Sequence, residues 1–223
     1  MNRRNLLMTA SAAAVGAAGL YWFTGGSNNA TLVPPAQAQS SDASEVDTSG
    51  VVEMTMGDPD APVTVIEYAS YTCPHCANFH RDTFKKIKSE FIDTGKVHFI
   101  YREVYFDRPG LWASMVARCG GPVRYFGVSE LLYEQQREWT SGDSSTIVAN
   151  LRKIGRTAGL DDATLDACLQ DADMAEALYA NYQKNMEADG IRSTPSFLIN
   201  GNLISVITNF SEFSRLIEAE LPS

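Results

Sequence analysis

The stretch EYASYTCPHC, residues 67–76, decides how the rest of the chain is interpreted. It joins an apolar run, residues 63–69, to two cysteines that are separated by two residues. A short apolar run bounded by turn residues is typical of a buried strand, and proline suits the first position of a helix. We therefore expect a strand over 63–69, a helix that starts at Cys73-Pro74 and stops at Gly95, and two thiols where strand and helix meet.

The pattern of apolar residues then changes twice along the chain. Residues 97–101 form a second expected strand and complete a βαβ start. A helical period holds from about 108 to 189, after which a strand pattern returns at 196–199. Asn200-Gly201 is a strong hairpin signal and predicts a partner strand over 203–206. An amphipathic helix closes the chain. The sequence thus predicts an α/β domain, residues 51–107 and 190–223, that is split by an all-helical insertion, residues 108–189.

The spacing of Cys73 and Cys76 predicts redox chemistry. Two thiols one helical turn apart can meet, and Cys73 at the helix start lies where backbone N–H groups and the helix dipole favour negative charge. A thiolate there is the reactive species in disulfide exchange. His75 lies between the cysteines, and a protonated imidazole would lower the pKa of Cys73 further. Because stabilising the reduced form makes a disulfide oxidising, we expect this pair to donate its disulfide.

Zinc and a purely structural bridge are the competing interpretations of a C-x-x-C pair. Tetrahedral zinc needs two such pairs or matching histidines. The other cysteines, Cys119 and Cys168, are isolated, and we expect His80 and His98 to be surface or packing residues. A bridge that closes a two-residue loop gains little entropy. We therefore expect no metal and no cofactor.

Two further features are candidates for the same site. Glu67 is the one ionisable residue in its apolar strand, and it precedes Cys73 by six residues. A buried carboxyl group there could relay protons during exchange, although an orientation toward water at a strand edge is the alternative. Thr194-Pro195 precedes the returning strand, where a cis peptide bond could place backbone beside the cysteines.

The N-terminal residues predict export. Residues 1–38 combine Arg3-Arg4, an uncharged run over 6–23 and a small-x-small cleavage signature at Ala36-Gln37-Ala38. We interpret them as a signal peptide, either twin-arginine or general secretory, with a retained membrane anchor as the minor alternative. Residues 39–50 are polar and form an expected flexible leader. The net charge of −9 and the lack of a basic cluster argue against nucleic acid as a partner.

At this point the chain resembles the DsbA family of periplasmic disulfide oxidases, which have a thioredoxin fold. The resemblance covers nearly all of the chain after Met54, and its Pro-His dipeptide between the cysteines is typical of the oxidising members. The residues that carry it are Glu67-Tyr68-Ala69-Ser70-Tyr71-Thr72-Cys73-Pro74-His75-Cys76 and, after the helical segment, Thr194-Pro195-Ser196-Phe197.

The resemblance implies a role for each matching residue. Cys73 would form the mixed disulfide with a substrate protein, Cys76 would resolve an unproductive adduct, and His75 would stabilise the Cys73 thiolate. Glu67 resembles the family's buried acid. Extended peptide would bind at the cis-proline loop, near the residues Thr194, Pro195 and Pro74. The partners would be reduced exported proteins and a membrane quinone-linked oxidase of the DsbB type, and the protein would be a periplasmic monomer.

The chain departs from the commonest family members in its second pair of cysteines. Some members from alphaproteobacteria resemble it in this respect, which implies a bridge between Cys119 and Cys168; two separate thiols are the alternative. A disulfide isomerase or reductase of the same fold, or a chaperone that binds peptide without redox turnover, are the competing functions. The intact Cys73 and Cys76 argue against the chaperone.

Overall fold

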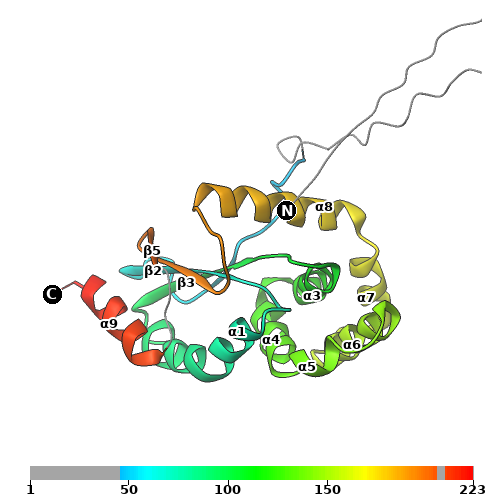
Figure 1. Ribbon diagram of the computed structural model, residues 1–223, viewed down its shortest axis with the longest axis horizontal. Coiled ribbons are helices and arrows are strands. Elements are labelled where there is room, and N and C mark those ends of the chain that lie inside the picture. The colour runs from blue at the N-terminus through cyan, green and yellow to red at the C-terminus, as the bar shows by residue number, and fades with distance from the viewer. Residues whose placement is uncertain (1–45, 205–208, 223) are drawn as a thin grey trace, which may run out of the picture. The chain divides into compact units, whose positions relative to one another are not determined.

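The computed structural model describes residues 46–204 and 209–222 of the chain. They form an α/β domain with a five-stranded sheet in the order β1-β3-β2-β4-β5 (Figure 1). Central strands β2 and β3 are parallel, and the other three pairings are antiparallel. The strands are β1 (Met54–Met56), β2 (Val63–Ala69), β3 (Val97–Glu103), β4 (Ser196–Ile199) and β5 (Asn202–Ile204).

Strand β2 lies at the centre of the sheet, and side chains on both of its faces are buried. Side chains alternate along a strand, so Val65 and Glu67 point to one face and Ile66 and Tyr68 to the other. The face with Val65 belongs to the main core, together with Phe213 of the last helix α9 (Phe210–Glu220). The same alternation therefore places the Glu67 carboxyl group under the helix that carries the cysteines.

That first helix is continuous over residues 74–92 but is not a regular α-helix. Two π-helical segments alternate with the α-helical ones: α1 (Pro74–Phe79), η1 (His80–Phe84), α2 (Lys85–Ile87) and η2 (Lys88–Ile92). Its apolar side chains pack into the main core, among them Phe79, Phe84, Ile87 and Phe91. Single π-helical turns are frequent at functional sites, and here one begins at His80, four residues after Cys76.

Residues 108–188 are helical almost throughout, and in Figure 1 helices α3 to α7 gather beside the sheet. Aspartate caps start four of these helices, with Asp107, Asp143, Asp161 and Asp171 each accepting a bond from a backbone N–H in the first turn. The helices are α3 (Arg108–Cys119), α4 (Gly121–Glu134), α5 (Gln136–Trp139), α6 (Ser144–Thr157), α7 (Asp162–Leu169) and α8 (Ala172–Ala188).

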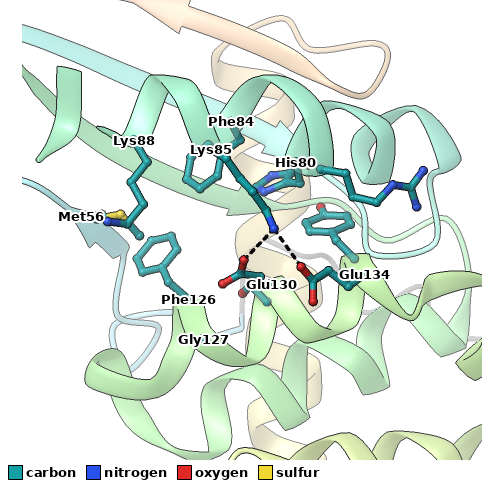
Figure 2. A pocket seen from close by; sticks show the side chains of 12 residues that line it. Met56, His80, Phe84, Lys85, Lys88, Phe126, Gly127, Glu130 and Glu134 are labelled. Atoms are coloured by element: carbon teal, nitrogen blue, oxygen red, sulfur yellow. Dashed lines mark hydrogen bonds and ion pairs between the residues drawn. The ribbon is translucent and has the colours of Figure 1, made fainter. Parts of the chain in front are cut away.

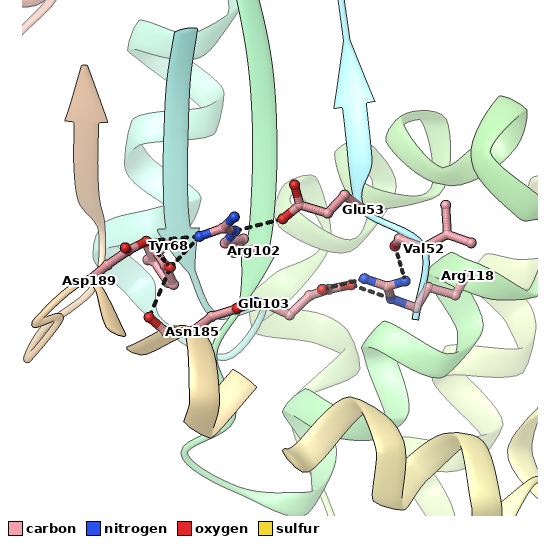
Figure 3. Close-up of polar contacts among 8 residues, drawn as sticks. All are labelled: Val52, Glu53, Tyr68, Arg102, Glu103, Arg118, Asn185 and Asp189. Carbon is pink, nitrogen blue, oxygen red and sulfur yellow. Dashed lines mark hydrogen bonds and ion pairs between the residues drawn. The ribbon is translucent and has the colours of Figure 1, made fainter. Parts of the chain in front are cut away.

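Helix α8 covers the second face of the sheet. Tyr182 and Met186 pack against a small cluster that includes Tyr68 and Leu198. Met174 and Leu178 of the same helix lie in another buried cluster, so this side of α8 is a packing surface. A polar network fastens the same region: Arg102 of β3 donates to Glu53 at 2.7 Å and to the Tyr68 hydroxyl and Asp189 at 2.8 Å each (Figure 3).

A second ion pair lies next to this network in Figure 3. Arg118 of α3 donates two hydrogen bonds of 2.7 Å to the carboxylate of Glu103, the last residue of β3. The arginine also donates to the carbonyl oxygen of Val52 at 2.8 Å. Both partners are largely buried, so the pair joins the helical segment to the sheet in a low-dielectric setting.

The fold has the thioredoxin-type mixed sheet and the helical interruption that the sequence predicts, with some differences in detail. The β3 strand runs to Glu103 rather than to residue 101, and the edge strand β1 has no counterpart in the prediction. The hairpin at Asn200-Gly201 forms, with Leu198 opposite Leu203. The predicted strand residues 205 and 206 and the predicted signal peptide over 1–38 lie outside the described residues.

Within residues 46–204 and 209–222, no helix has both the length and the apolar character needed to cross a bilayer.

Candidate active site

The two active-site cysteines lie at the start of the first helix, and both thiols are free. Cys73 has extended backbone angles and is the N-cap of α1, with Pro74 in the first turn. Cys76 lies one turn further on and has no solvent exposure, whereas Cys73 is 8% exposed. An incoming sulfur atom can therefore reach Cys73, and Cys76 is accessible only to Cys73.

The two thiols differ sharply in acidity. A hydrogen bond from the Cys76 thiol is the largest cause that lowers the pKa of Cys73, from 9.0 to about 5, against the opposing effect of partial burial. Backbone N–H groups at the helix start add to this effect. Burial raises the pKa of Cys76 far above its ordinary value, and the nearby charges of Glu67 and Cys73 raise it further. At neutral pH the reduced site therefore holds one thiolate, on Cys73, and one thiol, on Cys76.

Thr194 and Pro195 lie against Cys73 from the other side of the site. The peptide bond between them is cis, and the Cys73 thiol lies 3.6 Å from the carbonyl oxygen of Thr194. The Thr194 hydroxyl is buried, and it has no hydrogen-bond partner among the residues that the structure describes. It is thus available to donate to a thiolate on Cys73, which lowers the pKa of that thiol.

His75 contributes to the site through its backbone. Its N–H group lowers the pKa of Cys73, and its side chain is exposed. The imidazole is thus placed where a bound substrate could contact it. Its expected effect on the thiolate through a ring charge stays a prediction.

Glu67 is completely buried and pairs with a histidine. Its carboxylate oxygens lie 2.9 and 3.1 Å from Nε2 of His80, whose ring is 7% exposed. His80 is a packing residue, as expected, but its pairing with Glu67 was not expected. Cys76 and His80 are four residues apart in the helix and share its inner face. That i, i+4 spacing, together with a carboxyl group on the facing side of β2, is the sequence signal that could have found the pair.

Gln136 is a second residue at the site that the sequence did not indicate. Its side-chain amide is buried and donates to the carbonyl oxygens of Tyr71 and Cys73 at 2.8 and 2.9 Å. Gln136 comes from the insertion, 63 residues after Cys73, so no local pattern points to it. The insertion thus holds the loop before α1 in place.

A groove of about 310 Å³ opens next to the cysteines. The groove is lined by the chain neighbours of Cys73, which are Thr72 and Pro74. It is also lined by Asp107, Gln136 and Arg137. A polypeptide that reaches Cys73 would pass over this surface, between the sheet domain and the helical insertion.

The second pair of cysteines is bonded. Cys119, the last residue of α3, and Cys168 of α7 have a sulfur–sulfur distance of 2.06 Å and a Cα–Cα distance of 5.8 Å. The bridge joins two helices of residues 108–188 and is separate from the Cys73–Cys76 pair.

Comparison with known proteins shows to which family this fold belongs. A family model described as Thioredoxin matches residues 49–219. A Rickettsia bellii protein, provisionally named a protein-disulfide oxidoreductase, is 33% identical over 179 residues, which make up 77% of this chain and 68% of that protein. The chain covers only 53–55% of four other Rickettsia relatives. Disulfide bond formation protein D of Bacillus subtilis is 29% identical over 196 residues, with 82% and 83% coverage.

Solved structures agree with these relatives. Wolbachia pipientis alpha-DsbA1 superposes with a TM-score of 0.69 at 28% identity, over 75% of this chain and 89% of that one. Oxidised BdbD from Bacillus subtilis superposes with a TM-score of 0.67 at 25% identity, over 75% of this chain and 92% of that one.

Proposed function

Since this chain belongs to the thioredoxin-like family, and within it to the DsbA-type disulfide oxidoreductases, we propose that it is an exported oxidase that donates the Cys73–Cys76 disulfide to other exported proteins. The longer Rickettsia relatives have sequence outside the match, so their activity, substrates and partners are not transferred to this chain.

The observation that carries the proposal is the difference in acidity between the two thiols. With the pKa of Cys73 lowered to about 5, the reduced site keeps a thiolate that is stabilised by its surroundings at neutral pH. A disulfide whose reduced form is stabilised in this way is a strong oxidant, because reduction moves toward the more stable state. The same low pKa makes Cys73 a good leaving group when a mixed disulfide is resolved by the substrate.

The reaction would run in two exchanges. A substrate thiolate attacks Cys73 Sγ, the Cys73–Cys76 bond breaks, and the Cys76 sulfur takes up a proton. A second substrate thiolate then attacks the substrate sulfur of the mixed disulfide and releases Cys73 as a thiolate. The substrate gains one disulfide and loses two electrons, which the protein receives.

The surroundings of Cys73 suit an extended polypeptide. The carbonyl oxygen of Thr194 and the groove beside Thr72 and Pro74 flank the sulfur, and the His75 side chain is exposed. We assign substrate contact to Thr194, Pro195 and Pro74, and nucleophilic exchange to Cys73. Cys76 resolves unproductive adducts, and Glu67 supplies protons.

The compartment and the reoxidising partner are part of the proposal. The Cys119–Cys168 bridge supports an oxidising compartment, and the N-terminal sequence supports export to the periplasm. A membrane quinone-linked oxidase of the DsbB type would restore the Cys73–Cys76 disulfide after each turnover.

The test is to mix the oxidised protein with a reduced, unfolded substrate protein and to count the disulfides that the substrate gains. We expect one substrate disulfide for each Cys73–Cys76 pair consumed. The equilibrium with glutathione should give a potential more oxidising than the roughly −180 to −210 mV of an oxidising compartment. A strongly reducing potential would identify the chain as a reductase.

A further inference from the structure

A second cavity shares no lining residue with the groove beside Cys73. It has a volume of about 160 Å³ and lies between helix 74–92 and α4. Phe84, Phe126 and Tyr133 are among the rings that line it, and Figure 2 shows His80 among the same side chains. Lys85 reaches across to Glu130 and Glu134 at 3.1 and 2.8 Å, so charged groups border an otherwise apolar cavity.

His80 joins this cavity to the buried carboxyl group of Glu67. Its Nε2 edge faces the Glu67 carboxylate, while the ring itself lines the cavity. The ring stacks on Tyr133 at a centroid distance of 4.2 Å and packs against Phe84 at 4.6 Å, which fixes its plane. No described residue is a hydrogen-bond partner of Nδ1. Glu67 does not line the cavity, so His80 is the connection between the two.

Cys76 needs a path for protons from solvent, because its sulfur atom gains or loses a proton in each exchange. Its thiol is fully buried, and both burial and the charge of Glu67 raise its pKa. When the active-site disulfide is opened, Cys76 therefore needs a proton quickly, or its thiolate attacks Cys73 again. Solvent cannot supply this proton directly, because the Cys76 sulfur atom is not exposed to it.

The neighbouring phenols are poor sources of that proton. Burial raises the pKa of Tyr101 and of Tyr133 well above its ordinary value, and the two hydroxyls are bonded to each other at 2.5 Å. An imidazole can donate at one ring nitrogen while it accepts at the other, which is what passage of a proton across a ring requires.

We propose that His80 is a positioning residue for this exchange: it orients the Glu67 carboxyl group and passes protons to it from the cavity between helix 74–92 and α4. Nε2 of His80 gives its proton to the Glu67 carboxylate while Nδ1 takes one from water in the cavity, and Glu67 passes the proton to the Cys76 thiolate. The hydroxide left by that water is neutralised in solvent by the proton that the attacking thiol released when it ionised. The inference deepens the proposed function, but it requires only that Cys73 and Cys76 undergo exchange.

The exchange with glutathione isolates this step. Reduced glutathione attacks Cys73 of the oxidised protein, forms one sulfur–sulfur bond and breaks the Cys73–Cys76 bond, and Cys76 must be protonated for the mixed disulfide to persist. Oxidised glutathione drives the reverse reaction. Acid quenching followed by mass measurement gives the rate of mixed-disulfide formation and of its resolution.

We expect His80→Gln to slow both directions about 10²-fold, the low end of the effect of a positioned proton-transfer group. Glutamine keeps an N–H donor for Glu67 but cannot pass a proton through its amide. Because a relay changes rates and not end states, the equilibrium constant with glutathione should shift far less than the rates. His80→Ala should be equally slow and should recover when free imidazole, which fits the enlarged cavity, is added.

His98→Gln is the matched control, since His98 is a partly exposed histidine of β3 outside the cavity lining, and it should exchange at the unaltered rate. The proposal is overturned if His80→Gln also exchanges at that rate, or if His80→Ala is slow and imidazole does not restore it. A chain that exchanges with glutathione but fails to oxidise a reduced substrate protein would contradict the proposed function and leave this test of His80 intact.

Discussion

Cys73 and Cys76 are three residues apart at the start of a helix and carry free thiols, whereas Cys119 and Cys168 are 49 residues apart and bonded to each other. The first pair closes almost no loop, so its bond does little to restrict the unfolded chain; the second closes a long loop and restricts it strongly. The chain thus contains one disulfide suited to exchange and one suited to cross-linking.

The surroundings of the two pairs differ in the same sense. A hydrogen bond from Cys76 and the helix-start N–H groups stabilise the ionised form of Cys73, which favours opening the bond. Cys119 and Cys168 instead lie at the ends of two packed helices, α3 and α7, which hold the two sulfur atoms at bonding distance. Reactivity thus follows from what stabilises the thiolate, and cross-linking follows from loop length.

The largest expected effect distinguishes the pairs by activity. Cys73→Ser should lower the rate of substrate oxidation by at least about 10³-fold, because the nucleophile acts as part of a unit and no other group replaces it. The double variant Cys119→Ala/Cys168→Ala should keep the rate within a few fold. Disulfides gained by a reduced protein substrate measure both. Similar losses in the two variants would mean that the second pair also exchanges.

The Cys119–Cys168 pair, which should matter little for activity, should matter strongly for stability. Loss of the Cys119–Cys168 bridge should lower the free energy of unfolding by about 4 kcal/mol, as the chain-entropy relation gives for a loop of this length. Denaturant unfolding of the oxidised protein and of Cys119→Ala/Cys168→Ala provides the measurement. An unchanged midpoint would show that the helices alone restrict this loop.

The reduced protein should unfold at a higher temperature than the protein with an oxidised Cys73–Cys76 pair, by an amount that depends on pH. The pKa of Cys73 is lowered from 9.0 to about 5 on folding, so ionisation stabilises the reduced folded state. This contribution is complete above pH 9, is about 2–3 kcal/mol at pH 7, and disappears as the pH falls to 5.

Melting curves of both redox forms across this pH range test the expectation. A pH-independent difference between the two forms would mean that the Cys73 thiolate adds nothing to stability, and equal or reversed melting at neutral pH would remove the assignment as an oxidant.

The smallest expected effects separate individual contributions to the Cys73 thiolate. Thr194→Val removes the buried hydroxyl and should raise the pKa of Cys73, since that hydroxyl lowers it. His75→Ala should raise the pKa by less, because the exposed imidazole is lost but the backbone N–H stays. Thiolate absorbance against pH measures both variants. An unchanged titration for His75→Ala would show that the imidazole is a bystander.

Local sequence patterns predicted much of the fold. The apolar run at 63–69, Pro74 after Cys73 and the hairpin turn Asn200-Gly201 each carry a short-range signal, and each corresponds to an element of the structure. The short edge strand β1 was missed because three residues carry too little periodicity. The regular helix expected after Cys73 is interrupted by π-helical turns, which periodicity does not indicate.

Relations between distant residues needed the tertiary structure. Gln136 contacts Cys73 across 63 residues, and the bond between Cys119 and Cys168 spans 49. The functional weight of His80 depends on a carboxyl group from another element and on a cavity formed with the insertion. Apart from the i, i+4 spacing of Cys76 and His80, none of these leaves a pattern in the neighbouring sequence.

The sequence by itself determined that two thiols lie at the start of a helix that follows a buried strand. The apolar run, the proline and the spacing of the cysteines are signals that extend over only a few residues. Only the tertiary structure showed that Cys76 is fully buried, that Glu67 pairs with His80, and that Cys119 and Cys168 are joined. Acidity and proton transfer depend on burial and on partners brought together from far along the chain, and those are properties of packing.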